Sequence, residues 1–202
     1  MRNLSQYQNP KKSILFLGFD EKRTSIINFL INSKFNVDHT DQKVDEIKGY
    51  DFVVTFGYRH ILKSNVISES NCPIFNLHIS YLPYNRGAHP NFWSFYDNTP
   101  SGVTLHLMDE GIDTGPIIDQ KYINFDKGDD TFIKTHSALN LEMEKLFFDN
   151  LQLLISGQWV ATKQRGKGTI HFAKDLPVNF SGWDANIQNE ICKLDKEGLR
   201  YG

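Results

Sequence analysis

A polar cluster in the middle of the chain carries side chains suited to chemistry at a carbonyl group. Asn76 and His78 are separated by one residue, and side chains two positions apart in an extended segment lie on the same side. The Asn76 amide offers a neutral N–H donor, and the His78 imidazole offers a donor whose charge changes near neutral pH. Two donors that converge on one point would form an oxyanion hole for an acyl-transfer intermediate.

Such a site also needs a carboxylate to orient the histidine, and the cluster itself contains none. We expect it to come from residues 109–115, which combine aspartates and a glutamate with two glycines. Glycine lets the backbone approach a flat ligand closely.

The elements that must position these residues alternate between strands and helices in the first half of the chain. Short apolar runs predict buried strands at residues 13–18, 35–40, 51–56 and 73–76. Helices are predicted after Asp20, which can cap the first of them, and at 62–69. The alternation predicts an α/β fold with a mostly parallel sheet. Ligands bind such sheets at the carboxyl ends of the strands, and the polar residues 57–60 and 76–78 are expected to follow two of these ends.

The second half predicts a different arrangement. Residues 103–107 alternate with period two and 116–124 are extended, so an antiparallel pair is expected around the loop 109–115. Apolar residues at helical spacing predict one long closing helix over 131–156, ended by Gly157. We expect residues 1–202 to form a single domain with its core at about 13–157, and the tail 174–202 to be weakly structured.

Composition disfavours several classes of function. The 22 Lys and Arg against 24 Asp and Glu give a net charge of −2, which predicts no nucleic-acid partner held by a basic surface. Apolar runs fall far short of the roughly 20 residues that span a bilayer, so no membrane association and a cytoplasmic location are expected. The histidines and two cysteines lack metal-ligand spacing, so no metal is predicted.

Three motifs in order resemble one known family. They are Asn76-x-His78-x-Ser80-x-Leu82-Pro83, then Gly102–His106, then Asp113–Ile118. Together they resemble the 10-formyltetrahydrofolate-dependent formyltransferases, over a region from about Ile14 to Ser156. The resemblance implies a Rossmann-like formyltransferase domain with 10-formyltetrahydrofolate as co-substrate.

The resemblance also implies roles for individual residues. Asn76 and a protonated His78 would stabilise the tetrahedral oxyanion, while Asp113 would keep His78 charged and help to remove a proton from the attacking amine. His106 and Ser80 would lie next to these groups, without contacting the substrate, and would help to position them. The pterin would be cradled by the backbone of Arg59, His60, Ile61 and Leu62 and by the loop of Asp109, Glu110, Gly111 and Ile112.

Residues 76–87, 90–95 and 167–171 look most like the sugar N-formyltransferases. This implies a nucleotide-linked amino sugar as acceptor, with dTDP-4-amino-4,6-dideoxyglucose favoured and a role in O-antigen or other surface polysaccharide synthesis. The residues expected to bind it are Arg86, Tyr81 and Trp93. A homodimer is the prior expectation, because isologous dimers are the commonest soluble oligomers.

Three alternative functions compete with this interpretation. A glycinamide ribonucleotide formyltransferase would need a phosphate loop after the first strand, whereas residues 18–23 hold one glycine and an acidic pair. A methionyl-tRNA formyltransferase shares the pattern of residues 82–90, but the net charge gives little capacity to neutralise phosphates. The alternative from another class is a non-catalytic folate-binding protein.

Overall fold

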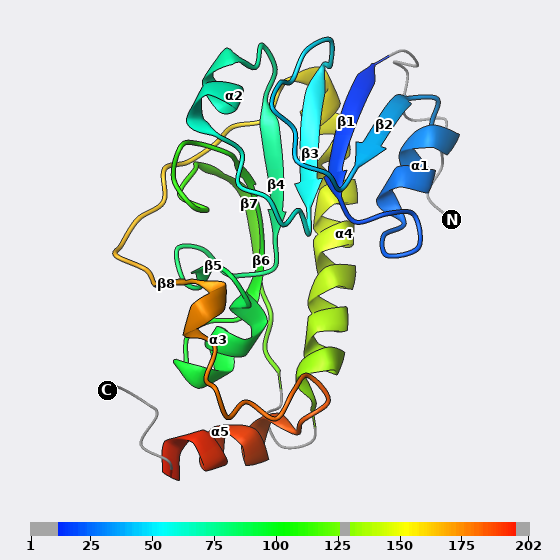
Figure 1. Ribbon diagram of the computed structural model, residues 1–202. Coiled ribbons are helices and arrows are strands. Elements are labelled where there is room, and N and C mark those ends of the chain that lie inside the picture. Colours follow the sequence, from blue (N-terminus) through cyan, green and yellow to red (C-terminus); the bar gives the residue numbers. More distant parts are fainter. Residues whose placement is uncertain (1–11, 126–129, 197–202) are drawn as a thin grey trace.

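A six-stranded sheet with the order β2-β1-β3-β4-β6-β7 forms the centre of the computed structural model, which describes residues 12–125 and 130–196 (Figure 1). The strands are β1 (Ser13–Gly18), β2 (Asn36–Thr40), β3 (Phe52–Phe56), β4 (Ile74–His78), β6 (Gly102–Leu107) and β7 (Ile117–Tyr122). The first four are parallel, β6 is antiparallel to β4, and β7 is antiparallel to β6. The predicted mostly parallel sheet with an antiparallel second half is therefore confirmed.

The helices are α1 (Ile26–Asn32), α2 (Ser64–Glu69), α3 (Pro90–Tyr96), α4 (Phe132–Ser156) and α5 (Ile187–Lys196). Three of them, α1, α2 and α4, cover the two faces of the sheet, whereas α3 and α5 pack together beyond one end of it (Figure 1). One core cluster joins α1 and α4 to one face of the strands, through residues such as Ile27, Met143 and Phe147. A second cluster on the opposite face joins Leu15 and Val53 to Val66 of α2. The result is a three-layer arrangement.

The long closing helix α4 has the ends that its sequence predicts. The side chain of Thr131 caps its first turn by accepting a hydrogen bond from the backbone N–H of Lys134. Gly157 ends it in the left-handed conformation, φ 70°, which glycine adopts without steric cost.

The expected cap of the first helix was wrong. Asp20 does not cap α1, because its carboxylate accepts from the backbone N–H groups of Lys22 and Arg23 in a separate turn. Glu144 of α4 binds the start of α1 instead, by accepting a hydrogen bond from the N–H of Ser25.

The tail is also more ordered than expected up to residue 196. A 3₁₀ turn, Ala173–Asp175, is followed by α5, whose Ile187 and Leu194 are fully buried against α3 and Phe132. Few apolar residues suffice here, because α5 places them on one face of the helix. Residues 197–202 lie outside the described part.

After α4 the chain crosses to the edge of the sheet formed by β7 and runs down beside that edge to β8 (Figure 1). We call residues 162–171 the strap. Thr162 pairs with Ile117 at its start, and its end forms β8 (Ile170–His171), which pairs in parallel with β5 (Arg86–Gly87). This segment brings residues far along the sequence next to the carboxyl end of β4.

Candidate active site

Asn76 and His78 lie inside β4 rather than after it. The strand is longer than predicted because β6 pairs with it as far as His78, opposite Thr104. Asn76 is paired with His106 in the same register. Two adjacent strands therefore place both predicted catalytic residues and the supporting histidine at one end of the sheet.

The Asn76 amide is fixed in orientation by hydrogen bonds on every side. Its Oδ1 accepts from Thr55 Oγ1 at 2.6 Å, and its Nδ2 donates to Asp113 Oδ1 at 2.9 Å. Nδ2 also lies 3.0 Å from His106 Nε2, while His106 Nδ1 lies 2.7 Å from the carbonyl oxygen of Leu107. Because only a protonated Nδ1 can donate to that carbonyl, these bonds assign Nε2 of His106 as the acceptor.

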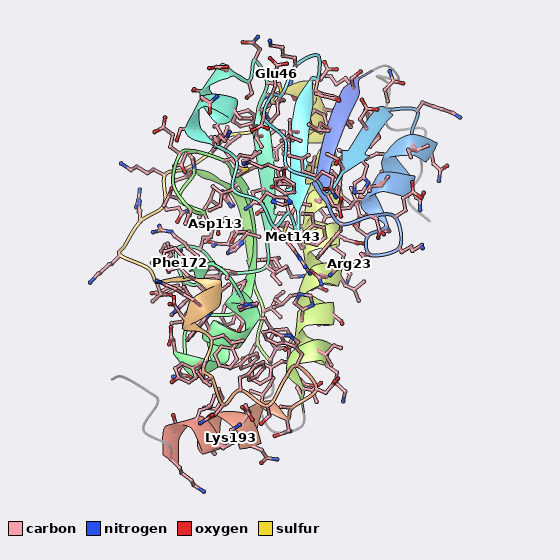
Figure 2. The ribbon with its side chains drawn as sticks, viewed as in Figure 1. Arg23, Glu46, Asp113, Met143, Phe172 and Lys193 are labelled. Carbon is pink, nitrogen blue, oxygen red and sulfur yellow. The ribbon has the colours of Figure 1, made fainter. Side chains whose placement is uncertain are left out.

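Asp113 lies at the centre of the group. Its Oδ2 accepts from the backbone N–H of Gly87 at 2.8 Å and lies 3.7 Å from His78 Nε2. Its Oδ1 lies 3.7 Å from His106 Nε2. Figure 2 shows Asp113 between the central strands and the segment that carries Phe172. The carboxylate expected from residues 109–115 is thus supplied by Asp113.

The charge of Asp113 is stabilised by these neighbours. Burial by itself raises the pKa of a carboxyl group, but the attraction of His78 and the N–H of Gly87 outweigh it and hold the pKa of Asp113 well below its usual range. The group is therefore an anion at neutral pH.

His78 is almost completely buried, with 8% of its surface exposed. Burial lowers the pKa of its imidazole below 6.5, although Asp113 acts in the opposite direction. Burial thus opposes the protonated His78 that the family motif implies, because it removes water from around the charged ring. Its Nε2 donates to the backbone carbonyl of Asn85 at 3.2 Å, so the neutral ring still presents an N–H donor.

This arrangement suits acyl transfer. Two N–H donors, from Asn76 and His78, lie beside one carboxylate, that of Asp113. Both donors bind protein oxygens, those of Asp113 and Asn85. A substrate oxygen would replace these acceptors, and such bonds commonly tighten only once substrate is present.

The other predicted site residues differ in how close they lie to this group. His106 contacts Asn76 directly. Ser80 is buried and donates to the carbonyl of Tyr84, so it stabilises the turn after β4. The ring of Tyr81 packs edge-on against Tyr122, with centroids 5.9 Å apart.

Trp93 and Arg86 have protein partners of their own. Trp93 is 5% exposed and stacks on His171 with centroids 3.9 Å apart and planes within 7°, which leaves little ring surface for a substrate. The Arg86 guanidinium donates to Gln164 Oε1 from Nε at 3.2 Å and from Nη2 at 2.6 Å.

The two segments expected to cradle the pterin are both at the surface. Arg59, His60 and Ile61 are exposed, and Leu62 is buried in the cluster that Met108 also joins. Asp109 shapes the second loop, because its Oδ1 accepts from Gly111 N at 3.1 Å and from Thr114 Oγ1 at 2.6 Å.

Two residues that contact the site, Thr55 and Gln164, are not predicted from the sequence. Thr55 is a lone hydroxyl in an apolar strand next to β4, and this position could have identified it. Gln164 lies in a polar loop, and nothing in the sequence indicates that this loop returns to Asp113.

Within the described residues no cluster of three His, Cys, Asp or Glu side chains could hold a metal ion. In the same part of the chain no helix combines the length and apolar character that crossing a membrane requires.

Comparisons with known proteins agree with this geometry. The family described as formyl transferase matches residues 7–149. A curated relative from Mycobacterium tuberculosis, dTDP-4-amino-4,6-dideoxyglucose formyltransferase, is 25% identical over 169 residues, which cover 81% of this chain and 71% of the relative.

Solved structures show the same fold. The formyltransferase PseJ from Anoxybacillus kamchatkensis, in complex with UDP-4,6-dideoxy-4-formamido-L-AltNAc and tetrahydrofolate, is 35% identical with a TM-score of 0.82. The match covers 90% of this chain and 98% of that one. A 4-N formyltransferase from Francisella tularensis has a TM-score of 0.75 at 18% identity, over 89% of this chain and 86% of that chain.

Proposed function

Because the chain belongs to the formyl transferase family, we propose that it moves a formyl group from 10-formyltetrahydrofolate to the amine of a nucleotide-linked amino sugar. The observation that carries the proposal is that Asp113 lies next to both donors. Asn76 Nδ2 donates to its Oδ1, and His78 Nε2 lies 3.7 Å from its Oδ2. These are the residues that the family motif assigns to catalysis.

The chemistry follows from the three side chains. The neutral amine of the sugar attacks the formyl carbon, and a tetrahedral oxyanion forms. The N–H groups of Asn76 and His78 stabilise that oxyanion. Asp113 accepts the proton that the amine loses, directly or through water. The bond from the formyl carbon to N10 of the folate then breaks, N10 receives the proton, and the products are a formamido sugar and tetrahydrofolate.

Burial of His78 refines this mechanism, because it lowers the pKa of the imidazole. A neutral imidazole is a weaker donor than an imidazolium, but its hydrogen bond strengthens as negative charge develops on the oxyanion. We propose that His78 donates as a neutral ring and takes up no proton of its own, so that the one proton lost by the amine passes through Asp113 to N10.

The folate is proposed to lie against the backbone of Arg59–Leu62 and the loop Asp109–Ile112. Leu62 and Met108 pack into the same apolar cluster, so the bases of the two segments are joined. PseJ is described with tetrahydrofolate bound, which supports a folate donor for this chain.

The acceptor is proposed to be a nucleoside diphosphate linked to a 4-amino-4,6-dideoxyhexose. The curated mycobacterial relative acts on dTDP-4-amino-4,6-dideoxyglucose, and PseJ is described with the 4-formamido-4,6-dideoxy form of a UDP-linked sugar. Both names share the amine position and the missing 6-hydroxyl. We keep dTDP-4-amino-4,6-dideoxyglucose as the specific hypothesis and a UDP-linked 4-amino sugar as its alternative. Arg86, Tyr81 and Trp93 remain proposed acceptor contacts, with Trp93 weakest because it is covered.

The test is to incubate the protein with 10-formyltetrahydrofolate and each acceptor separately, and to measure products by mass spectrometry. The acceptors are the dTDP-linked and UDP-linked 4-amino sugars and glycinamide ribonucleotide. A gain of one formyl group on either sugar nucleotide supports the proposal, and the kcat/KM ratio between them identifies the base. Formylation of glycinamide ribonucleotide alone would overturn it. Folate binding without transfer to any acceptor would favour the non-catalytic alternative.

A further inference from the structure

Gln164 of the strap makes an amide clamp on the loop that carries Asp113. Its Nε2 donates to the backbone carbonyl of Asp113 at 2.8 Å and to that of Gly115 at 2.9 Å. Its Oε1 accepts the two hydrogen bonds from Arg86. Both N–H groups and the oxygen of this side chain are therefore used, and the side chain has a single orientation that satisfies them.

The clamped loop contains a residue in the left-handed conformation and a tight backbone approach. Asp113 has φ +51°, a conformation that costs energy in a residue with a Cβ and persists where surrounding contacts enforce it. A Cβ on Gly115 would lie 1.8 Å from the carbonyl oxygen of Leu107, so the loop passes tightly over β6. Gln164 bonds the carbonyls on both sides of Thr114.

Asp113 is thereby held from two directions. The backbone N–H of Gly87 bonds its carboxylate at 2.8 Å, and Gln164 bonds its carbonyl. Gly87 and Arg86 form β5, which pairs with the end of the strap. One small structural unit, β5 with the strap, therefore fixes both the backbone and the carboxylate.

The same strap also reaches the support of His78. Thr169 Oγ1 accepts from the backbone N–H of Asn85 at 2.8 Å and bonds its Oδ1 at 3.1 Å. The carbonyl of Asn85 is the acceptor for His78 Nε2. The positions of both Asp113 and His78 thus depend on contacts from residues 164–169.

We propose that Gln164 is a positioning residue for formyl transfer, which holds the Asp113 carboxylate at Asn76 and His78, and that Arg86 acts through it. The inference rests on the proposed function for the role of Asp113. It goes beyond that proposal because it assigns a task to a segment outside the three family motifs, and because it gives Arg86 a second role beside its proposed contact with the acceptor.

The first test replaces Gln164 with Met, which has similar length and volume but no amide. We expect kcat to fall about 10- to 100-fold, because a displacement on the order of 1 Å at a catalytic group is enough for such a loss. KM for donor and acceptor should change by less than about 2-fold, since ground-state contacts are kept. Gln152→Met, the same change at an exposed position of α4, is the matched control and should behave as wild type.

Gln164→Glu separates positioning from simple packing. A carboxylate still accepts from Arg86 but cannot donate to the two carbonyls, so its kcat should fall as far as that of Gln164→Met. A Glu variant with wild-type kcat would overturn the clamp, because it would show that only the Arg86 contact matters.

A double-mutant cycle tests the part played by Arg86. If Arg86 acts through Gln164, the Arg86→Met/Gln164→Met double variant should lose no more than about 3-fold beyond Gln164→Met alone. If the losses in kcat multiply, Arg86 does not act through Gln164, and that part of the proposal is wrong; a raised acceptor KM in Arg86→Met reports on its separately proposed contact with the acceptor.

A readout without activity keeps the test separate from the proposed function. Hydrogen exchange of peptides covering residues 109–115 should be at least about 10-fold faster in Gln164→Met than in Gln152→Met, because the loop loses its restraint. Unchanged exchange in a folded variant contradicts the clamp, whatever the enzyme transfers. If the wild type transfers no formyl group, but residues 109–115 still exchange faster in Gln164→Met, only the proposed function is contradicted.

Discussion

Replacing Asn76 with Ala removes one of the two donors that the mechanism requires. Its Nδ2 bonds Asp113 and His106, and its Oδ1 accepts from Thr55. The substitution deletes these contacts while the N–H of Gly87 continues to bind the Asp113 carboxylate. The variant should therefore fold with the remaining site largely in place.

The size of the effect follows from the role assigned to the amide. Loss of one oxyanion donor costs about 100- to 1000-fold in kcat, on the order of 2.7–4 kcal/mol. Thr55→Val keeps that donor and removes only the bond that orients it, a net contribution of about 1 kcal/mol, which corresponds to roughly 5-fold. Leaving Thr55 and His106 without their partner costs about 1–3 kcal/mol of stability.

The assay is steady-state formyl transfer with each substrate varied, at a temperature well below the unfolding transition of every variant. Asn65→Ala, the same change at an exposed position of α2, is the control and should keep wild-type turnover. The order wild type, Thr55→Val, Asn76→Ala is expected in kcat. Near-native turnover in Asn76→Ala, or a larger loss in Thr55→Val than in Asn76→Ala, would refute the reasoning.

Three further predictions concern charge, packing and pH. Asp113→Asn should lower kcat at least about 100-fold with small changes in KM, because the proton acceptor is lost; wild-type kcat would contradict its role. Gly115→Ala should lower the free energy of unfolding by more than about 1 kcal/mol in urea titrations, because its methyl group meets backbone; unchanged stability would show that the loop adapts freely. Burial lowers the folded-state pKa of His78, His89 and His136 below 6.5. The unfolded chain therefore binds protons at a higher pH than the folded chain does. As a result, the free energy of unfolding should fall as pH drops below about 6.5. The His78→Gln variant should show a shallower fall between pH 7 and 5.5, and an equal slope would contradict the burial effect.

Much of the sheet could be predicted because its signals are local. The strand 13–18 and the helix α4 have apolar patterns and end residues that define them without help from distant parts of the chain. The antiparallel pair of β6 and β7 was likewise visible from alternation. The pattern does not predict the helix α3, since all seven of its residues are buried, the polar Asn91 and Ser94 among them, which removes the amphipathic helical period.

The site was predictable where a motif covers it and not elsewhere. Asn76, His78 and Asp113 come together as their motifs imply. The burial that lowers the pKa of His78 could not be predicted from the sequence, because only the folded structure shows it. Gln164 lies 51 residues from Asp113 in the sequence, and the contact arises from the path of the strap after α4.

The central claim is that the formyl group passes to the amine of a sugar nucleotide at the site of Asn76, His78 and Asp113. The most direct measurement uses a donor labelled with ¹³C in the formyl group, and quantifies ¹³C-formamido sugar, tetrahydrofolate and free formate over time. Wild type should form labelled sugar and tetrahydrofolate in equal amounts with little formate, and Asn76→Ala should form almost none. Release of labelled formate with an unmodified sugar would contradict the account and show a hydrolase in place of a transferase.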